Sequence, residues 1–211
     1  MAKASTAKKK ASERWSLPAT QERSRATREK LLDAAETVFA AKGYNGAKIS
    51  DIAEEAGCSV GSVYFRFKDK DALFFAIAES FIEDARNGVG KLFAAEGVAP
   101  EIVVRTFVTA TAANFRKHRG LFRAIVERGF DHPLAMKTIF GFREELAAAL
   151  EKALHGRSEP GIHIRVMTQM VYGFLITGIL NKDAPTQISD AQAIGGLADA
   201  CIAYLNTGDK R

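Results

Sequence analysis

The apolar residues of this 211-residue chain recur at helical spacing in one segment after another. In residues 24–42, the side chains of Leu31, Leu32, Ala35, Val38 and Phe39 share one face of a helix. The same pattern predicts further helices over residues 49–56, 59–67, 70–87, 121–127, 133–154, 162–180 and 188–205, and one that follows residue 100. We find no alternating strand pattern and no internal repeat, so the sequence predicts an all-α protein.

Turn residues divide the first third of the chain into a compact unit. Gly43 suits the left-handed end of the first helix, and Gly57 supplies a tight turn between the next two short helices. Ser59 is a candidate N-cap for the third helix. Two short helices joined in this way indicate a helix-turn-helix. We therefore predict a flexible arm over residues 1–23, a three-helix DNA-binding domain over 24–70 and a larger helical domain over 71–211, in which residues 71–87 form the connecting helix.

The charge distribution agrees with a nucleic-acid partner. Residues 1–30 carry nine Lys or Arg and three Asp or Glu. Their net charge of 9 − 3 = +6 exceeds the net charge of +5 of the whole chain. A basic segment beside a helix-turn-helix is where contacts to phosphates are expected. The alternative interpretation is a solubilising tail that touches nothing.

The third predicted helix has two different faces. Val63 and Phe67 lie four positions apart and are expected to pack inward, on Ile52 and Phe39. The opposite face carries Val60, Gly61, Tyr64 and Phe65, and a free surface rarely exposes such a group of apolar residues. In the major groove, apolar side chains can contact thymine methyl groups, and hydroxyls can bind phosphates. The alternative is a helical hairpin whose aromatic residues pack on the C-terminal half.

Residues 25–75 resemble the TetR-type transcriptional regulators. The matching positions are Leu31, Asp33, Ala34, Ala35, Phe39, Gly43, Tyr44, Ile52, Ala53, Ala56, Gly57, Cys58, Ser59, Gly61, Ser62, Val63, Tyr64, Phe67, Lys70 and Leu73. The resemblance implies an all-α homodimer of about nine helices that binds a palindromic operator, usually as a repressor, and is released by a small molecule. It places Ser50, Val60, Gly61 and Phe65 nearest to base edges, and Lys48, Ser59, Ser62, Tyr64, Arg66 and Lys70 at the DNA backbone. Two positions depart from the family pattern: Lys48 replaces the usual Thr or Ser cap, and Arg66 replaces His or Tyr.

The C-terminal two-thirds resembles the family only in length and helical character. Apolar stripes along the last two helices, residues 162–206, predict a homodimer interface, although the two helices could simply bury each other. Fourteen phenylalanines, together with three methionines in the C-terminal region, favour an apolar ligand pocket, against the alternative of ordinary core packing. The residues that we assign to this pocket are Phe93, Phe107, Phe115, Phe122, Met136, Phe140, Met167, Met170 and Phe174.

Other classes of function find little support in the sequence. The four histidines and two cysteines match no metal or disulfide spacing, and we see no nucleophile motif or phosphate-binding loop. We therefore expect no metal, no cofactor and no enzymatic activity. The apolar run 166–180 is interrupted by polar residues and is shorter than the roughly 20 residues that cross a bilayer. The N-terminus lacks a secretory signal, which favours a cytoplasmic protein without membrane contact.

Taken together, these patterns predict a homodimeric repressor that a small hydrophobic or amphipathic ligand releases from DNA. An activator or a ligand-independent regulator with the same DNA-binding module is the alternative. A third hypothesis is a small-molecule-binding or enzymatic helical domain with an incidental basic arm. The exposed face of residues 60–65 argues against this third hypothesis.

Overall fold

The computed structural model describes residues 2–93, 97–128, 133–156, 161–181 and 183–208. Within these ranges the regular secondary structure is entirely α-helical, as predicted. In chain order the helices are α1 (Ala2–Gly46), α2 (Ile49–Glu55), α3 (Val60–Tyr64), α4 (Lys70–Phe93), α5 (Pro100–Lys117), α6 (Arg119–Arg128), α7 (Pro133–His155), α8 (Ile162–Leu180) and α9 (Ala191–Gly208).

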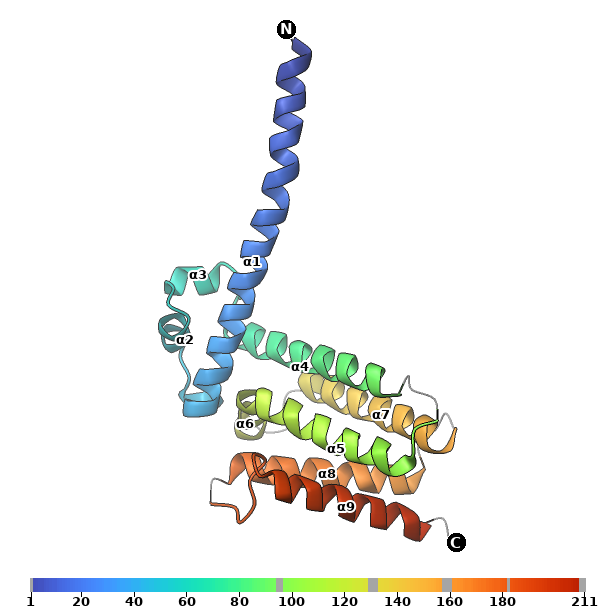
Figure 1. The fold of residues 1–211 in the computed structure, drawn as a ribbon. Coiled ribbons are helices and arrows are strands. Elements are labelled where there is room, and N and C mark those ends of the chain that lie inside the picture. Colours follow the sequence, from blue (N-terminus) through green and yellow to red (C-terminus); the bar gives the residue numbers. More distant parts are fainter. Residues whose placement is uncertain (1, 94–96, 129–132, 157–160, 182, 209–211) are drawn as a thin grey trace.

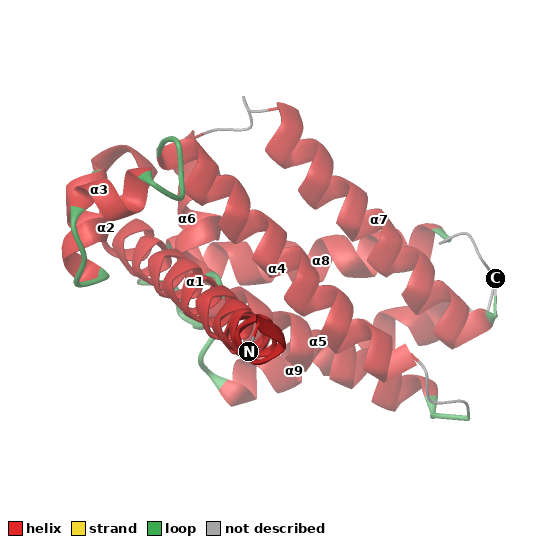
Figure 2. Cartoon of the chain, turned by 90° about the horizontal axis from the view of Figure 1, so that it is seen from above, coloured by secondary structure: helices red, strands yellow, loops and turns green. Residues whose placement is uncertain are grey.

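The first three helices pack around a small core of their own. Phe39 of α1, Ile52 of α2 and Val63 of α3 are completely buried in it. Gly43 has a φ of 71° and Gly57 a φ of 59°, so both occupy the left-handed region that favours glycine. Seen along α1, the helices α2 and α3 lie together at one end of the molecule, far from the C-terminus (Figure 2).

The remaining helices form a bundle that continues this core. α4 leaves the N-terminal unit and runs beside α5 and α7, while α9 packs on α5 and α8 (Figure 1). α6 packs extensively against the C-terminal half of α1. The buried apolar residues of both parts belong to one continuous cluster.

One helix, α8, is long and apolar enough to span a membrane by length and composition alone. Core helices of soluble bundles pass the same test, and α8 buries one stripe of its surface inside the bundle. The stripe consists of Ile164, Met167, Thr168, Val171, Leu175, Gly178 and Ile179. This burial agrees with our interpretation of residues 162–180 as a packed helix.

Several element boundaries differ from prediction. α1 begins at Ala2, so the structure has no break at residue 24 between an arm and a first helix. Residues 2–23 are rich in Ala, Lys, Glu and Arg, which favour helix, and the helix continues through Pro18 at the cost of one backbone hydrogen bond. α4 continues to Phe93, past the predicted end near Gly88, and α3 ends at Tyr64.

Candidate nucleic-acid interface

The third helix exposes one face and buries the other, as its sequence pattern predicted. Val63 is fully buried and Phe67 is nearly so. On the opposite face Val60 is 41%, Tyr64 54% and Phe65 83% exposed. Together these three side chains form an exposed apolar surface on a packed element, the kind of surface that is common at interaction sites.

The start of α3 is held by its own side chains. Ser59 is the N-cap, and its Oγ accepts a hydrogen bond from the backbone N–H of Ser62 at 3.2 Å. The two serine hydroxyls also lie 2.9 Å apart. This cap keeps the first turn in a fixed orientation although the helix has only five residues.

Gly61 lies exposed at the centre of this first turn. A Cβ at this position would meet only Ser59 Oγ, at an ordinary 3.8 Å, and the backbone conformation does not require glycine. Glycine inside a helix costs about 1 kcal/mol relative to alanine, so packing within the protein does not explain it. The missing side chain leaves room for a partner to approach the backbone closely.

The second helix begins at Lys48, whose side chain makes no capping hydrogen bond. Asp51 caps it from inside, since its carboxylate accepts the backbone N–H of Lys48 at 3.0 Å and lies 3.0 Å from Lys42 Nζ. These hydrogen bonds, first that of Lys42 and then that of Lys48, hold the pKa of Asp51 below its usual value. Lys48 and Ser50, at the start of α2, have exposed side chains, and α2 itself packs beside α3 (Figure 1).

Arg66 follows α3 and is half-buried. Its guanidinium carbon lies 5.6 Å from the centre of the Phe65 ring, within range of a cation–π contact. Its Nε is buried and has no hydrogen-bond partner among the described residues. A buried guanidinium N–H without a partner is costly, and a phosphate group nearby would lower that cost electrostatically.

Lys70 has a contact that the sequence did not reveal. Its Nζ donates to the carbonyl oxygens of Tyr44 at 2.6 Å and Ala47 at 2.9 Å, and lies 4.3 Å from the centre of the Tyr44 ring. The Tyr44 hydroxyl in turn donates to Asp71. These contacts tie the start of α4 to the end of α1. Lys70 therefore has a structural role, and its contact with DNA stays a prediction.

The residues predicted for the ligand pocket are only partly brought together. Phe107, Phe115, Phe122 and Met167 are buried, Phe174 is half-buried, and Met170 is 38% exposed on the outside of α8. The side chains of Phe93, Met136 and Phe140 lie outside the described residues. Phe115 and Phe122 stack with their ring centres 3.9 Å apart.

Three further aromatic residues join this stack. Phe81 meets both rings edge-on, and Phe142 and Tyr172 contact Phe81 and Phe115. Burial raises the pKa of the Tyr172 hydroxyl, against the opposing effect of Arg143. Phe81 was not assigned to the pocket from the sequence, because apolar periodicity does not distinguish a pocket wall from ordinary core. Met170 instead lines a groove of about 410 Å³ between α7 and α8, together with Arg143 and Arg165.

These features define a class: an all-helical protein whose N-terminal helix-turn-helix presents an uncovered face and whose remaining helices form one bundle. Residues 31–77 match the family model described as bacterial regulatory proteins, tetR family. Over these residues the chain is similar to this family, and relatives and solved structures of the same family resemble it. The sequence resemblance is thereby confirmed.

Individual relatives support this assignment. Over 58 residues the chain is 41% identical to the HTH-type transcriptional repressor Rv1474c of Mycobacterium tuberculosis, a match that spans 28% of this chain and 31% of that repressor. The match therefore spans about a third of the length of this curated relative.

Solved structures extend the likeness to the whole fold. A TetR-family regulator from Mesorhizobium loti has a TM-score of 0.67 at 20% identity, over 88% of this chain and 98% of that one. FadR from Bacillus subtilis, in complex with stearoyl-CoA, has a TM-score of 0.60 at 17% identity, over 83% and 98%. At such identities the likeness concerns the fold.

Proposed function

We propose that this protein is a sequence-specific DNA-binding transcriptional regulator, acting in the cytoplasm as a repressor. The observation that carries the proposal is the exposed face of α3, with Val60, Tyr64 and Phe65 uncovered above a fully buried Val63. The recognition helix of such a unit lies in the major groove, and its first turns contact base edges. The repressor name of the Mycobacterium relative supports the sign of the regulation.

The direct test is selection of binding sites from a random DNA library with the full-length protein at near-physiological salt. Enrichment of a palindrome is expected, since two copies of α3 must read two half-sites. Weak, salt-sensitive binding without any enriched sequence would contradict the proposal and leave only non-specific attraction of the basic segment.

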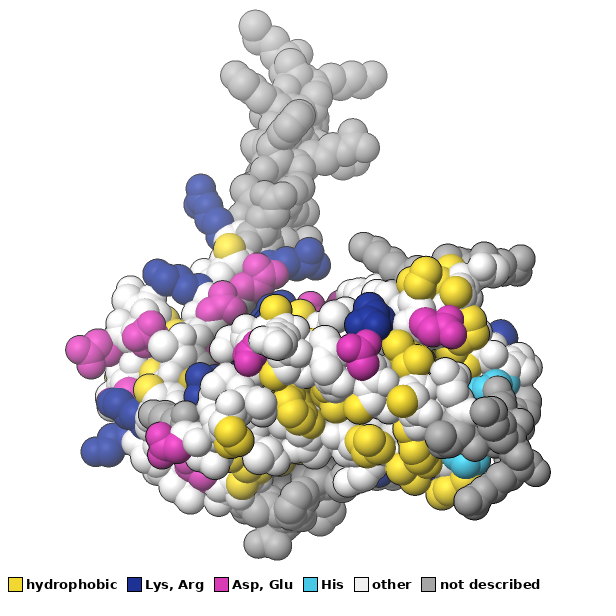
Figure 3. Space-filling view, turned by 60° about the horizontal axis from the view of Figure 1, so that its bottom comes forward, with side chains coloured by type: hydrophobic (Ala, Val, Ile, Leu, Met, Phe, Trp, Pro, Cys, Tyr) yellow, Lys and Arg dark blue, Asp and Glu magenta, His cyan; other side chains and the backbone are white. Residues whose placement is uncertain are grey.

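We further propose that the protein acts as a homodimer through α8 and α9. On α8, Gly173 is exposed on the same face as Met170 and Leu180, and on α9 the exposed residues Gly196, Ala200 and Ala203 share one face. A Cβ at Gly173 or Gly196 would meet no atom within 4 Å, so another helix could approach closely here. Apolar side chains spread over this side of the bundle, which supports an interface (Figure 3).

Sedimentation equilibrium tests the dimer. The wild type is expected to be dimeric at micromolar concentration, and Gly196→Glu, which places a charge in the proposed interface, is expected to be monomeric and to lose operator binding. Ala110→Glu introduces the same charge at an exposed position on α5 and serves as the control. A monomeric wild type would contradict the dimer.

The effector is proposed to be a small hydrophobic or amphipathic molecule that enters near the aromatic stack of Phe81, Phe115 and Phe122. The stearoyl-CoA complex of FadR supports long acyl compounds as the first to be tested. Binding would shift α4 and change the separation of the two α3 helices, which must match one turn of DNA. Release of the selected operator by an acyl-CoA or fatty acid is the expected result. If a broad panel of apolar compounds leaves operator binding unchanged, a ligand-independent regulator is the better description.

A further inference from the structure

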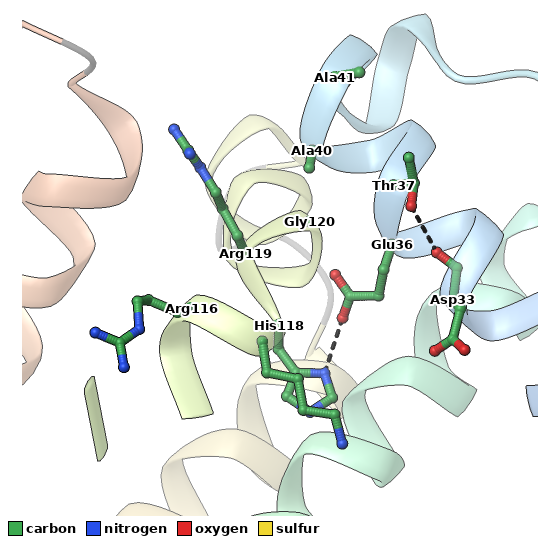
Figure 4. Close-up of a pocket in the computed structure, with 10 residues that line it drawn as sticks. Asp33, Glu36, Thr37, Ala40, Ala41, Arg116, His118, Arg119 and Gly120 are labelled. Atoms are coloured by element: carbon green, nitrogen blue, oxygen red, sulfur yellow. Dashed lines mark hydrogen bonds and ion pairs between the residues drawn. The ribbon is translucent and has the colours of Figure 1, made fainter. Parts of the chain in front are cut away.

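A charged cluster lies where the N-terminal unit meets the bundle. It occupies the inner end of a cleft of about 620 Å³ between α1 and the junction of α5 with α6 (Figure 4). His118, the residue between the two helices α5 and α6, is at its centre, with only 5% of its side chain exposed. The cleft gives solvent a path to an otherwise buried histidine.

Both ring nitrogens of His118 face a carboxylate. Nδ1 lies 2.9 Å from Oε1 of Glu36 on α1, and Nε2 lies 3.1 Å from Oδ2 of Asp84 on α4. The imidazole therefore joins a helix of the N-terminal unit to the helix that connects this unit with the bundle. The ring edge of Phe81, 5.5 Å away between centroids, covers the cluster on the α4 side.

The two contacts have a simple requirement. An ionised carboxylate only accepts hydrogen bonds, and a neutral imidazole has one N–H and one bare nitrogen. Only the imidazolium can donate to Glu36 and Asp84 together. Loss of its proton leaves a nitrogen lone pair against a carboxylate oxygen in a largely buried place, which is unfavourable.

The surrounding groups keep the Asp84 carboxylate ionised. Burial opposes the charge of Asp84, but hydrogen bonds from Lys117 and His118 outweigh it and hold the pKa of Asp84 below its usual value. Oε2 of Glu36 accepts the backbone N–H of Leu121, at the start of α6, at 3.0 Å. Asp33 on α1 and Arg116 and Arg119 on the α5–α6 side also line the cleft. Histidine is the side chain whose charge ordinarily changes between about pH 5 and 8.

We propose that His118 is a proton-operated latch between the N-terminal unit and the bundle, closed when the imidazole is protonated and open when it is neutral. With the latch open, the single N–H of His118 can donate to only one of the two carboxylates, so the imidazole no longer joins α1 to α4 and the N-terminal unit moves more freely on the bundle. Binding to two half-sites must then restrict this freedom. The latch rests on the proposed DNA-binding function for its consequence, which is that operator affinity falls as the pH rises.

Glu36→Gln separates the latch from other effects of pH. The glutamine amide can donate an N–H to the bare Nδ1 of a neutral His118, while its oxygen still accepts from Leu121. The closed contact then no longer depends on the proton. His155 lies 3.3 Å from Glu151 within α7, away from α1, and His155→Gln therefore serves as the matched control.

The experiment measures affinity for the selected operator at about pH 6 and about pH 8, the limits of ordinary histidine titration, at constant ionic strength. For the wild type and His155→Gln we expect a loss of about five-fold or more, the lower range of coupling between sites. For Glu36→Gln we expect less than about two-fold. Equal affinity of the wild type at both pH values, a gain at the higher pH, or a Glu36→Gln protein that loses as much as the wild type would overturn the latch.

A second measurement separates failure of the latch from failure of the proposed function. Hydrogen exchange of the Leu121 amide, corrected for the intrinsic effect of pH, reports its contact with Glu36 without any DNA. Protection is expected to decrease at the higher pH in the wild type and to stay constant in Glu36→Gln. If no operator is found but this difference is seen, the latch stands and the DNA-binding proposal falls; unchanged protection in the wild type overturns the latch.

Discussion

Gly120 offers a direct test of how tightly α6 is seated on α1. It is buried in the first turn of α6, and a Cβ there would lie 2.1 Å from the carbonyl oxygen and 2.9 Å from the carbonyl carbon of Glu36. Both are backbone atoms that cannot turn aside as a side chain can. Gly120→Ala must therefore push α6 and α1 apart.

The expected size follows from two opposing effects. Overpacking of this kind costs about 1–3 kcal/mol, whereas alanine in place of glycine in a helix gains up to about 1 kcal/mol. The gain from helix propensity is smaller in the first turn, so a net loss of stability of about 1–2 kcal/mol remains. In a chain of this length each kcal/mol lowers the melting temperature by roughly 2–4 °C, and we expect a decrease of roughly 2–8 °C.

Gly141→Ala is the matched control. Gly141 is exposed within α7, and a Cβ there would meet nothing within 4 Å. Only the gain in helix propensity applies, so the melting temperature should rise by roughly 2–4 °C. Thermal unfolding followed by circular dichroism at neutral pH compares the two variants. If Gly120→Ala is as stable as Gly141→Ala, the close seating of α6 on α1 is refuted.

The remaining predictions concern DNA contacts and thiol chemistry. Tyr64→Ala should abolish operator binding while changing the free energy of unfolding by no more than about 0.5 kcal/mol, as is usual at the surface; operator titration and thermal unfolding check both. Removal of residues 2–20 should weaken binding to all DNA sequences and reduce the dependence of log K on log salt by roughly 0.9 for each lost phosphate contact; an unchanged slope would make the segment passive. Burial raises the pKa of the Cys201 thiol to about 11. The neutral thiol is thus favoured in the folded protein, and at about pH 8 only about one Cys201 in a thousand is a thiolate. A thiol reagent should therefore modify half-buried Cys58 well before Cys201, and equal native rates would contradict this burial.

The structure of the N-terminal unit was largely predictable because it depends on the spacing of residues that lie close together in the sequence. Val63 and Phe67 lie four positions apart and are buried, while Val60, Tyr64 and Phe65 are exposed on the other side. Both outcomes depend on helical periodicity and on the turn at Gly57. The helix over residues 162–180 was predicted with the bounds that α8 has. The start of α1 at Ala2 was not predicted. A lack of apolar periodicity indicates a segment that packs on nothing, but it does not exclude a helix.

The contacts between the N-terminal unit and the bundle could not be predicted, because they join residues far apart in the chain. Arg123 of α6 donates to the carbonyl oxygens of Ala40 at 2.7 Å and Ala41 at 3.1 Å, and His118 reaches Glu36 across 82 positions. In the sequence, His118 lies in a basic run that reads as a solvated helix end. Its burial depends on where α1 and α4 pass, which tertiary packing decides. The surface that would read DNA is thus set by local pattern, whereas the contacts that would control it are set by packing, so a related sequence can keep α3 unchanged and still respond to different signals.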